Sequence, residues 1–251
     1  MHSGLKIPPA LEKNFLETLN RADFSGCFEG VTRVGKSSLD QLVALACNFA
    51  VAPISGFKVG ALAIGKSGKA YLGANMEFIG MPLHASLHAE QSAVINAWMH
   101  GETSIESLMV SELPCGHCRQ FLLELHDAEK LEMLIQGARK SLAGLMPEPF
   151  GRTRPRGRGL LDSPSRKVIS IQAEVGNNAQ RAINAASRSY TPYSQSPEGF
   201  VIELIDGHSF AGRTAESIAF NPSVPAAITA LNQLNLSAQR KVAISRCTHA
   251  K

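Results

Sequence analysis

The sequence has no apolar run of the length that crosses a membrane, and this absence argues against an integral membrane protein. A spanning helix needs about 20 consecutive apolar residues, whereas charges and prolines interrupt the apolar residues at the start of the chain. The same interruptions leave no apolar core for a signal peptide. We therefore expect a cytoplasmic protein without a membrane partner.

Charge of one sign is also scarce. The 251 residues carry a net charge of +4, and the pI is near 8.9. Proteins that bind nucleic acid usually concentrate basic residues on one face, so we expect no nucleic-acid partner. Apolar residues make up 44% of the chain and charged residues 18%, which is ordinary for a globular protein that buries a core.

Cysteine is sparse, and its count of five is odd. In a reducing compartment a Cys-x-x-Cys pair is more typical of a metal site or a redox dithiol than of a structural disulfide. No thioredoxin-like pattern surrounds Cys115 and Cys118, and no second pair completes a zinc ribbon. Both of those alternatives are therefore weaker than a single metal site.

Hydrophobic periodicity predicts an α/β fold with helices flanking a sheet. The elements expected in the first part of the chain are helices over 8–22, 38–51, 89–99 and 118–125, and strands over 57–64, 69–74, 108–111 and 131–135. A stretch rich in proline, glycine and arginine follows them and predicts a linker. The expected division is an N-terminal helical segment (1–37), a first domain (38–149), a linker (150–168) and a second domain (169–251).

The second domain repeats the first in degenerate form. Pro53 and Pro192 are 139 residues apart, and the same separation relates Gly60 to Gly199, Gly73 to Gly212 and Glu77 to Glu216. Several matches at one constant separation indicate a duplication.

One constellation points to chemistry. His88-Ala89-Glu90 is followed by Pro114-Cys115-Gly116-His117-Cys118, a pattern typical of zinc-dependent nucleobase deaminases. One imidazole and two thiolates suit zinc and leave its fourth position open for water. Zinc lowers the pKa of that water to about 7, and Glu90 would carry protons. We therefore expect one Zn²⁺ per chain, bound by His88, Cys115 and Cys118, with Glu90 as the catalytic residue.

The spacing of these residues predicts their local structure. Cys115 and Cys118 are three apart, so they face one way on a helical turn whose N-terminus favours thiolates. His88 and Glu90 are two apart, so we expect His88 at an irregular helix entry and Glu90 in the first turn. His117 as a fourth ligand would close the site, and this alternative stays open.

These motifs, together with Asn75-Met76-Glu77, resemble those of the cytidine deaminases of pyrimidine salvage. The resemblance implies a cytidine-deaminase-like, helix-flanked mixed β-sheet and hydrolytic deamination of cytidine and 2'-deoxycytidine by zinc-bound hydroxide. It also implies that Asn75 and Glu77 bind the ribose hydroxyls, as two residues on one side of an extended segment can. The substrate-binding residues that it adds are Phe57 beside the base, Ala89, and Phe150 closing over the site.

The duplication is similar to that of the larger cytidine deaminases, which are homodimers with an intact first domain and a degenerate second one. Asn221–Ala227 stands where the second His-x-Glu should lie, and it contains neither a metal ligand nor a carboxylate. The second domain is expected to be abbreviated, since the sequence ends before its last helix and strand.

Two other functions compete with this interpretation. A nucleic-acid-editing deaminase could use Arg152, Arg154, Arg156 and Arg158 to bind phosphates, although a ribose clamp containing a carboxylate fits a free nucleoside better. A catalytically inactive module is the second, because the chain's own second half has lost the metal motif.

Overall fold

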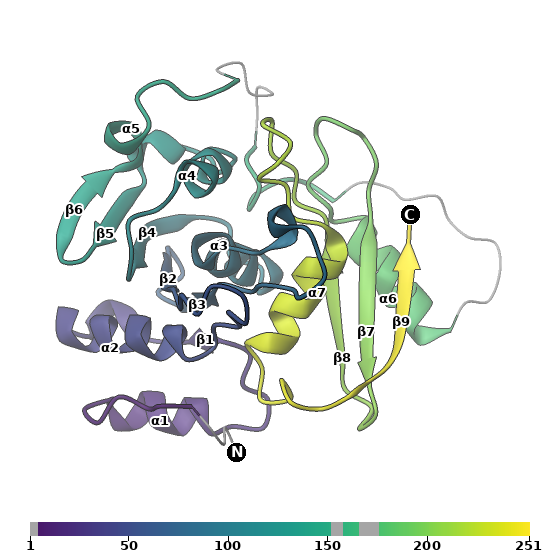
Figure 1. Ribbon diagram of the computed structural model, residues 1–251, viewed down its shortest axis with the longest axis horizontal. Coiled ribbons are helices and arrows are strands. Elements are labelled where there is room, and N and C mark those ends of the chain that lie inside the picture. The colour runs from purple at the N-terminus through teal and green to yellow at the C-terminus, as the bar shows by residue number, and fades with distance from the viewer. Residues whose placement is uncertain (1–4, 152–157, 166–175) are drawn as a thin grey trace.

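The computed structural model describes residues 5–151, 158–165 and 176–251. The first copy contains a six-stranded sheet in the order β1-β3-β2-β4-β5-β6 (Figure 1). Its strands are β1 (Cys27–Phe28), β2 (Gly60–Gly65), β3 (Ala70–Ala74), β4 (Ile105–Val110), β5 (Glu132–Ile135) and β6 (Ala138–Ser141). The sheet is mixed, because β4 and β5 run parallel and the other pairs are antiparallel.

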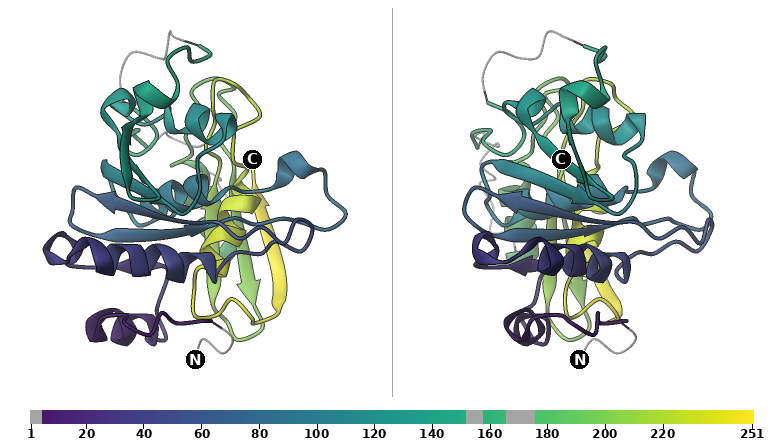
Figure 2. Two further views of the ribbon diagram at one scale, coloured as in Figure 1. Left: turned by 60° about the vertical axis from the view of Figure 1, so that its left-hand side comes forward. Right: turned by 90° about the vertical axis from the view of Figure 1, so that its left-hand side faces the viewer.

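Helices cover both faces of this sheet. They are α1 (Lys13–Leu19), α2 (Lys36–Cys47), α3 (Ala89–Met99), α4 (Gly116–Leu122) and α5 (Leu142–Leu145). Helix α2 packs against one face of β2 and β3 with α1 beyond it, and α3 packs against the other face (Figure 2). Every residue of β2 and β3 is therefore buried, as expected for strands enclosed on both sides.

The second copy contains the three-stranded sheet β8-β7-β9. Its elements are α6 (Asn177–Ala186), β7 (Gly199–Leu204), β8 (Ser209–Arg213), α7 (Ala226–Asn235) and β9 (Ile244–Ala250). Strand β7 pairs with β8 and β9 as β2 pairs with β3 and β4, all antiparallel. The predicted duplication is thus a duplication of structure.

Close packing of a helix on the sheet requires glycine at equivalent places in the two copies. A Cβ on Gly73 would lie 2.2 Å from the backbone nitrogen of Ala93, and one on Gly212 would lie 2.1 Å from the carbonyl oxygen of Ala226. These distances are well below van der Waals contact, so a side chain at either place would push α3 or α7 off its sheet.

The two copies share a polar interface between α3 and α7. Ser92 Oγ donates to Asn232 Oδ1 at 2.6 Å, and Asn232 Nδ2 donates to the Ser92 carbonyl at 3.1 Å. A buried carboxylate, Glu124, lies nearby in sequence terms only to the end of α4, yet it accepts hydrogen bonds from the hydroxyls of Tyr190 (3.0 Å) and Tyr193 (2.7 Å) of the second copy. Buried polar groups satisfied in this way fix how the two copies dock.

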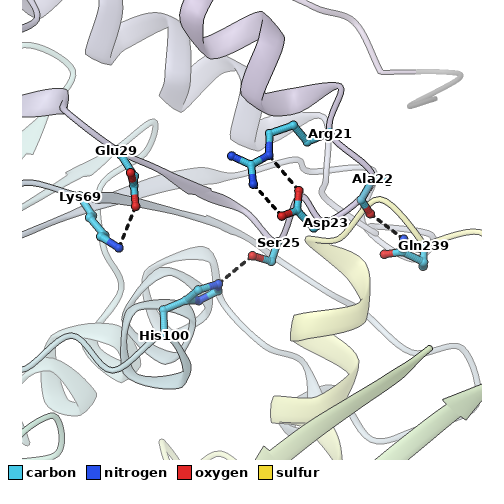
Figure 3. A network of polar contacts seen from close by, with 8 residues as sticks. All are labelled: Arg21, Ala22, Asp23, Ser25, Glu29, Lys69, His100 and Gln239. Carbon is cyan, nitrogen blue, oxygen red and sulfur yellow. Dashed lines mark hydrogen bonds and ion pairs between the residues drawn. The ribbon is translucent and has the colours of Figure 1, made fainter.

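The N-terminal segment contacts both copies (Figure 3). Ser25 Oγ and His100 Nε2 are 2.8 Å apart, which ties the segment to the end of α3. Gln239 Nε2 of the second copy donates to the Ala22 carbonyl at 2.8 Å. Among the described residues, no helix has the length and apolar character needed to cross a membrane.

Candidate zinc and substrate site

Two helix starts bring the three expected metal ligands together. His88 is the N-cap of α3 and has an extended backbone (φ −87°, ψ 157°), as the spacing to Glu90 predicts. Cys115 is the N-cap of α4, and Cys118 lies in its first turn. Pro114 therefore precedes the cap instead of beginning the helix.

The distances within this group fit a tetrahedral zinc ion. Nδ1 of His88 is 3.4 Å from Sγ of Cys115 and 3.2 Å from Sγ of Cys118, and the two sulfur atoms are 3.7 Å apart. Zinc–sulfur bonds of about 2.3 Å and zinc–nitrogen bonds of about 2.0–2.1 Å at tetrahedral angles require separations of roughly 3.6 Å between N and S and 3.8 Å between the sulfurs. The residues present therefore suit zinc with one position open.

His117 does not join this group. Among the described residues the cluster of potential ligands consists of His88, Cys115 and Cys118. The ring of His117 instead stacks on the ring of His88, with centroids 4.9 Å apart and planes inclined by 27°. This arrangement argues against a closed, four-ligand site.

The surroundings favour a thiolate at Cys115. The pKa of this thiol is lowered to about 3, mainly by its contact with Cys118 and further by His88 and the backbone of the α4 start. The pKa of His88 is raised, mainly by its contact with Cys115. An imidazole and thiols that polarise one another at this range are ready to exchange their protons for a metal ion.

Glu90 follows the metal group on the first turn of α3. Its side chain is only 5% exposed, and this burial is the main cause of a raised pKa. A buried carboxyl group with a raised pKa can hold and release a proton near neutral pH, which suits a proton carrier.

A cavity of about 420 Å³ opens beside these residues, a size typical of small-molecule sites. Its lining includes the predicted residues Phe57, Asn75, Glu77, His88, Ala89, Glu90 and Cys115, together with Ser55, Val59, Leu83, Ser86, Leu87, Glu112 and Leu113. The structure thus brings residues from far apart in the sequence to one pocket, with buried Cys118 directly behind the other two ligands.

Asn75 and Glu77 are anchored to one loop at the mouth of this cavity. Asn75 Oδ1 accepts from the Val59 N–H at 2.8 Å, and its Nδ2 donates to the Phe57 carbonyl at 2.9 Å. Glu77 Oε2 accepts from the N–H groups of Ile54 (2.9 Å) and Ser55 (3.0 Å). The Ser55 hydroxyl also bonds Glu77, and this contact is the main reason why the pKa of Glu77 is lowered.

These anchors leave capacity for a ligand. An ionised carboxylate offers about four acceptor sites and an amide two donors and two acceptors, so each side chain retains free positions. Both groups are fixed in orientation before any ligand arrives.

Phe150 is not brought to this cavity. It is absent from the lining residues, and its side chain is 61% exposed. Its backbone is held instead by Gln120, which accepts from the Phe150 N–H at 3.2 Å and donates to its carbonyl at 3.1 Å.

Two positioning residues escaped the sequence analysis. Gln91 Oε1 accepts from the His88 N–H at 3.2 Å, and its Nε2 donates to the carbonyl of Pro222 in the second copy at 2.8 Å. Arg119 donates to the carbonyls of Pro114 (2.8 Å) and Leu145 (2.7 Å) and so braces the start of α4. A glutamine three residues after a helix cap was a usable signal, whereas nothing local marked Arg119.

Comparison with known proteins extends this result to the whole chain. A family model described as the cytidine and deoxycytidylate deaminase zinc-binding region matches residues 36–133, and a second model of the same description matches residues 142–249. Cytidine deaminases of Yersinia pestis and Yersinia pseudotuberculosis are 44% identical over 206 residues, which cover 82% of this chain and 70% of each relative. The chain belongs to the cytidine deaminase family.

Solved cytidine deaminases of single-domain length are similar as well. The enzyme from Burkholderia pseudomallei is 29% identical, with a TM-score of 0.42 over 47% of this chain and 100% of that one. The family's two tandem regions identify this chain as the larger, two-domain kind of cytidine deaminase. Zinc is the cofactor of such domains, and the group of His88, Cys115 and Cys118 is placed to hold a metal ion.

Proposed function

We propose that the protein hydrolyses cytidine and 2'-deoxycytidine to uridine and 2'-deoxyuridine with release of ammonia, as an enzyme of pyrimidine salvage. One observation carries the proposal. A ligand group with zinc geometry and a buried glutamate share a cavity with an anchored amide and carboxylate. Such a cavity suits a small polar substrate with both a reactive ring and hydroxyl groups.

Zinc bound by His88, Cys115 and Cys118 supplies hydroxide at neutral pH, because it lowers the pKa of a bound water to about 7. Glu90 takes the proton released in this process. It then delivers protons to the ring nitrogen and to the departing amine, so that water and cytidine yield uridine and ammonia. Its burial supports this role, because exclusion of water strengthens each proton-transfer contact.

Asn75 and Glu77 bind the ribose hydroxyls in this proposal. Their existing bonds to the loop over residues 54–59 hold them in place, so little ordering is needed when substrate binds. A site built to bond hydroxyl groups rejects ligands that lack them, because its buried polar groups are then left unpaired.

Phe57 and Ala89 contact the pyrimidine. Phe57 lines the cavity with a side chain that is 56% exposed, and Ala89 lines it between the metal ligand and the proton carrier. For Phe150 the support is the resemblance alone, since the side chain does not line the cavity.

The enzyme acts as a cytoplasmic homodimer in this proposal. All five cysteines are free, which suits a reducing compartment. Large apolar side chains stand exposed near the cavity mouth (Ile79, Met81 and Leu83) and on the second copy (Phe220), a distribution typical of an association surface. A measured mass of one chain in solution would contradict the dimer.

The same proposal divides the chain into an N-terminal segment (1–37), a catalytic domain (38–149), a linker (150–168) and a degenerate domain (169–251). The matched regions at 36–133 and 142–249 support two units. Arg152, Arg154 and Arg156 lie outside the described residues, so the phosphate-binding alternative gains no support from the structure.

Ammonia release tests the proposal directly. Purified protein is incubated with cytidine, deoxycytidine, dCMP, adenosine and guanine, with and without a zinc chelator. Deamination of only cytidine and deoxycytidine, stopped by the chelator, is the expected result. Silence on all five by a protein that holds zinc, combined with deamination of single-stranded DNA or RNA, would replace the nucleoside with a polymer.

A further inference from the structure

A second cavity, of about 210 Å³, lies where the end of α3 meets the second copy. It is lined by Met99, Arg181, Asn184, Ala185, Arg188, Ala211 and Arg213. We call it the arginine cavity. It shares no residue with the zinc pocket, and its lining holds three guanidinium groups and no carboxylate.

Two elements of the second copy aim these residues at one another. Arg181, Asn184, Ala185 and Arg188 follow helical spacing along α6 and its end, so they share one face. Arg213 ends β8 and lies two residues after Ala211 on the same side of that strand. Arg181 is held in place by donating to the side chain and carbonyl of Ser209.

Arg213 is buried without a countercharge. It is 4% exposed, and its Nη2 donates to the Trp98 carbonyl at 2.7 Å while its guanidinium lies 3.9 Å from the centre of the Trp98 ring. Its Nε is buried and has no hydrogen-bond partner among the described residues. Burial, reinforced by the positive charge of Arg188, lowers the pKa of Arg213 to about 9.

Packing alone does not call for these charges. At the separation of 139 residues, the equivalents of Arg181, Arg188 and Arg213 in the first copy are Leu42, Phe49 and Ala74. All three are fully buried core residues. The same scaffold is therefore built with apolar side chains in one copy and with three arginines around a cavity in the other.

We infer that the arginine cavity binds the phosphate group of a small anion. Guanidinium groups offer paired N–H donors that match phosphate oxygens, and an anion would supply the countercharge that the described residues do not. The volume exceeds that of a single water several times over, since one water needs about 10–15 Å³ by such a measure. Free phosphate and the phosphate of a nucleotide share this chemistry.

Trp98 reports on this site because it is the only tryptophan of the chain. It touches Arg213 at one end of α3, and His88 stands at the other end, about 15 Å away at 1.5 Å per residue over ten residues. Titration of the native, zinc-loaded protein with inorganic phosphate at constant ionic strength is expected to change the Trp98 emission in a saturable way. The same titration with CMP distinguishes the two sources of phosphate.

Arg188→Ala is the test variant, because this exposed side chain makes no ion pair with a described residue. We expect the dissociation constant for phosphate to rise about tenfold or more, which corresponds to losing one charge-assisted contact. Arg213→Gln, checked for an unchanged circular dichroism spectrum, should abolish the change. Arg246→Ala, which removes the same charge from exposed β9, should leave the affinity within twofold.

Saturable binding that Arg188→Ala weakens and Arg246→Ala does not supports the inference. Tighter binding of CMP than of phosphate, with the same dependence on Arg188, identifies a nucleotide as the ligand, and equal binding identifies free phosphate. Absence of any phosphate response, or equal weakening by Arg246→Ala, overturns it and leaves Arg213 as a contact between Trp98 and the second copy only.

Discussion

The two copies of the deaminase fold keep the same scaffold and differ at the reactive positions. Equivalent glycines admit α3 and α7 to their sheets, and equivalent single bridges join Met76 to Leu87 and Ala215 to Val224. These bridges also reveal a change of register. Met76 and Ala215 are 139 residues apart, whereas Leu87 and Val224 are 137 apart, so the second copy is two residues shorter in between.

The change of register identifies what replaced the catalytic residues. Pro225 is the N-cap of α7, as His88 is of α3. Ala227 therefore stands where Glu90 stands, and no ligand or carboxylate remains. Packing was retained while metal binding was lost, although the family model still matches this region.

One residue crosses this division. Glu216 accepts from the N–H groups of Tyr193 (3.0 Å) and Ser194 (3.2 Å), just as Glu77 does from Ile54 and Ser55. A contact kept in the copy without a metal site serves the scaffold. Glu77 thus combines a structural role with its proposed role in binding ribose, while its partner Asn75 is replaced by Thr214.

Removing a metal ligand should have the largest effect and separate the copies completely. We expect Cys118→Ala to lose both zinc and deamination, because two ligands hold the ion poorly. Metal analysis of the purified variant measures the loss. Pro225→Ala is the matched control, and it should retain one zinc per chain with full activity. A drop in its zinc content would show that the second copy takes part in metal binding.

Removing the proton carrier should affect rate without affecting metal. Glu90→Ala is expected to lower kcat by about 10²–10⁴-fold, the usual contribution of a positioned acid–base group, and to keep its zinc. Ala227→Glu, which restores a carboxylate at the equivalent place, should change kcat less than twofold. Near-normal turnover by a zinc-loaded Glu90→Ala protein would exclude Glu90 from the mechanism.

Glu77→Ala and Glu216→Ala sharpen the comparison at the shared carboxylate. Both remove two backbone contacts, so both should lower Tm by similar amounts. Only Glu77→Ala should reduce kcat/KM for cytidine, by about tenfold or more, since hydroxyl recognition fails. Activity on free cytosine, measured beside it, should change little. An equal loss of cytidine deamination in both variants would reduce Glu77 to its structural role.

Local signals made much of this site predictable. Helix α3 has the bounds 89–99 that its periodicity indicates, and the spacing of His88 and Glu90 correctly requires a helix entry between them. The hairpin of β2 and β3 and the ligand helix α4 were also expected, with ends shifted by a few residues. Such features depend on neighbours within one or two turns.

Contacts between segments far apart in the sequence were not predictable. Glu124 meets Tyr193, 69 residues away, and Gln91 meets Pro222, 131 residues away, only because the two copies dock. The first helix is also shorter than expected, since α1 spans Lys13–Leu19 and not 8–22. Its length is decided by packing of Phe15 and Leu19 into the core, which periodicity alone does not delimit.

The smallest effect is expected where the second copy contacts the first. Tyr193 donates its hydroxyl to buried Glu124 at 2.7 Å, whereas its equivalent Ile54 is 50% exposed. Tyr193→Phe leaves one acceptor site of a buried carboxylate unfilled, which costs about 1–2 kcal/mol. Urea denaturation should show this loss, and Ile54→Val should stay within about 0.5 kcal/mol. Because the zinc pocket is built from the first copy, deamination by folded Tyr193→Phe should be unchanged. A fall in kcat at full zinc occupancy would instead show that docking of the degenerate copy controls the geometry of the active one.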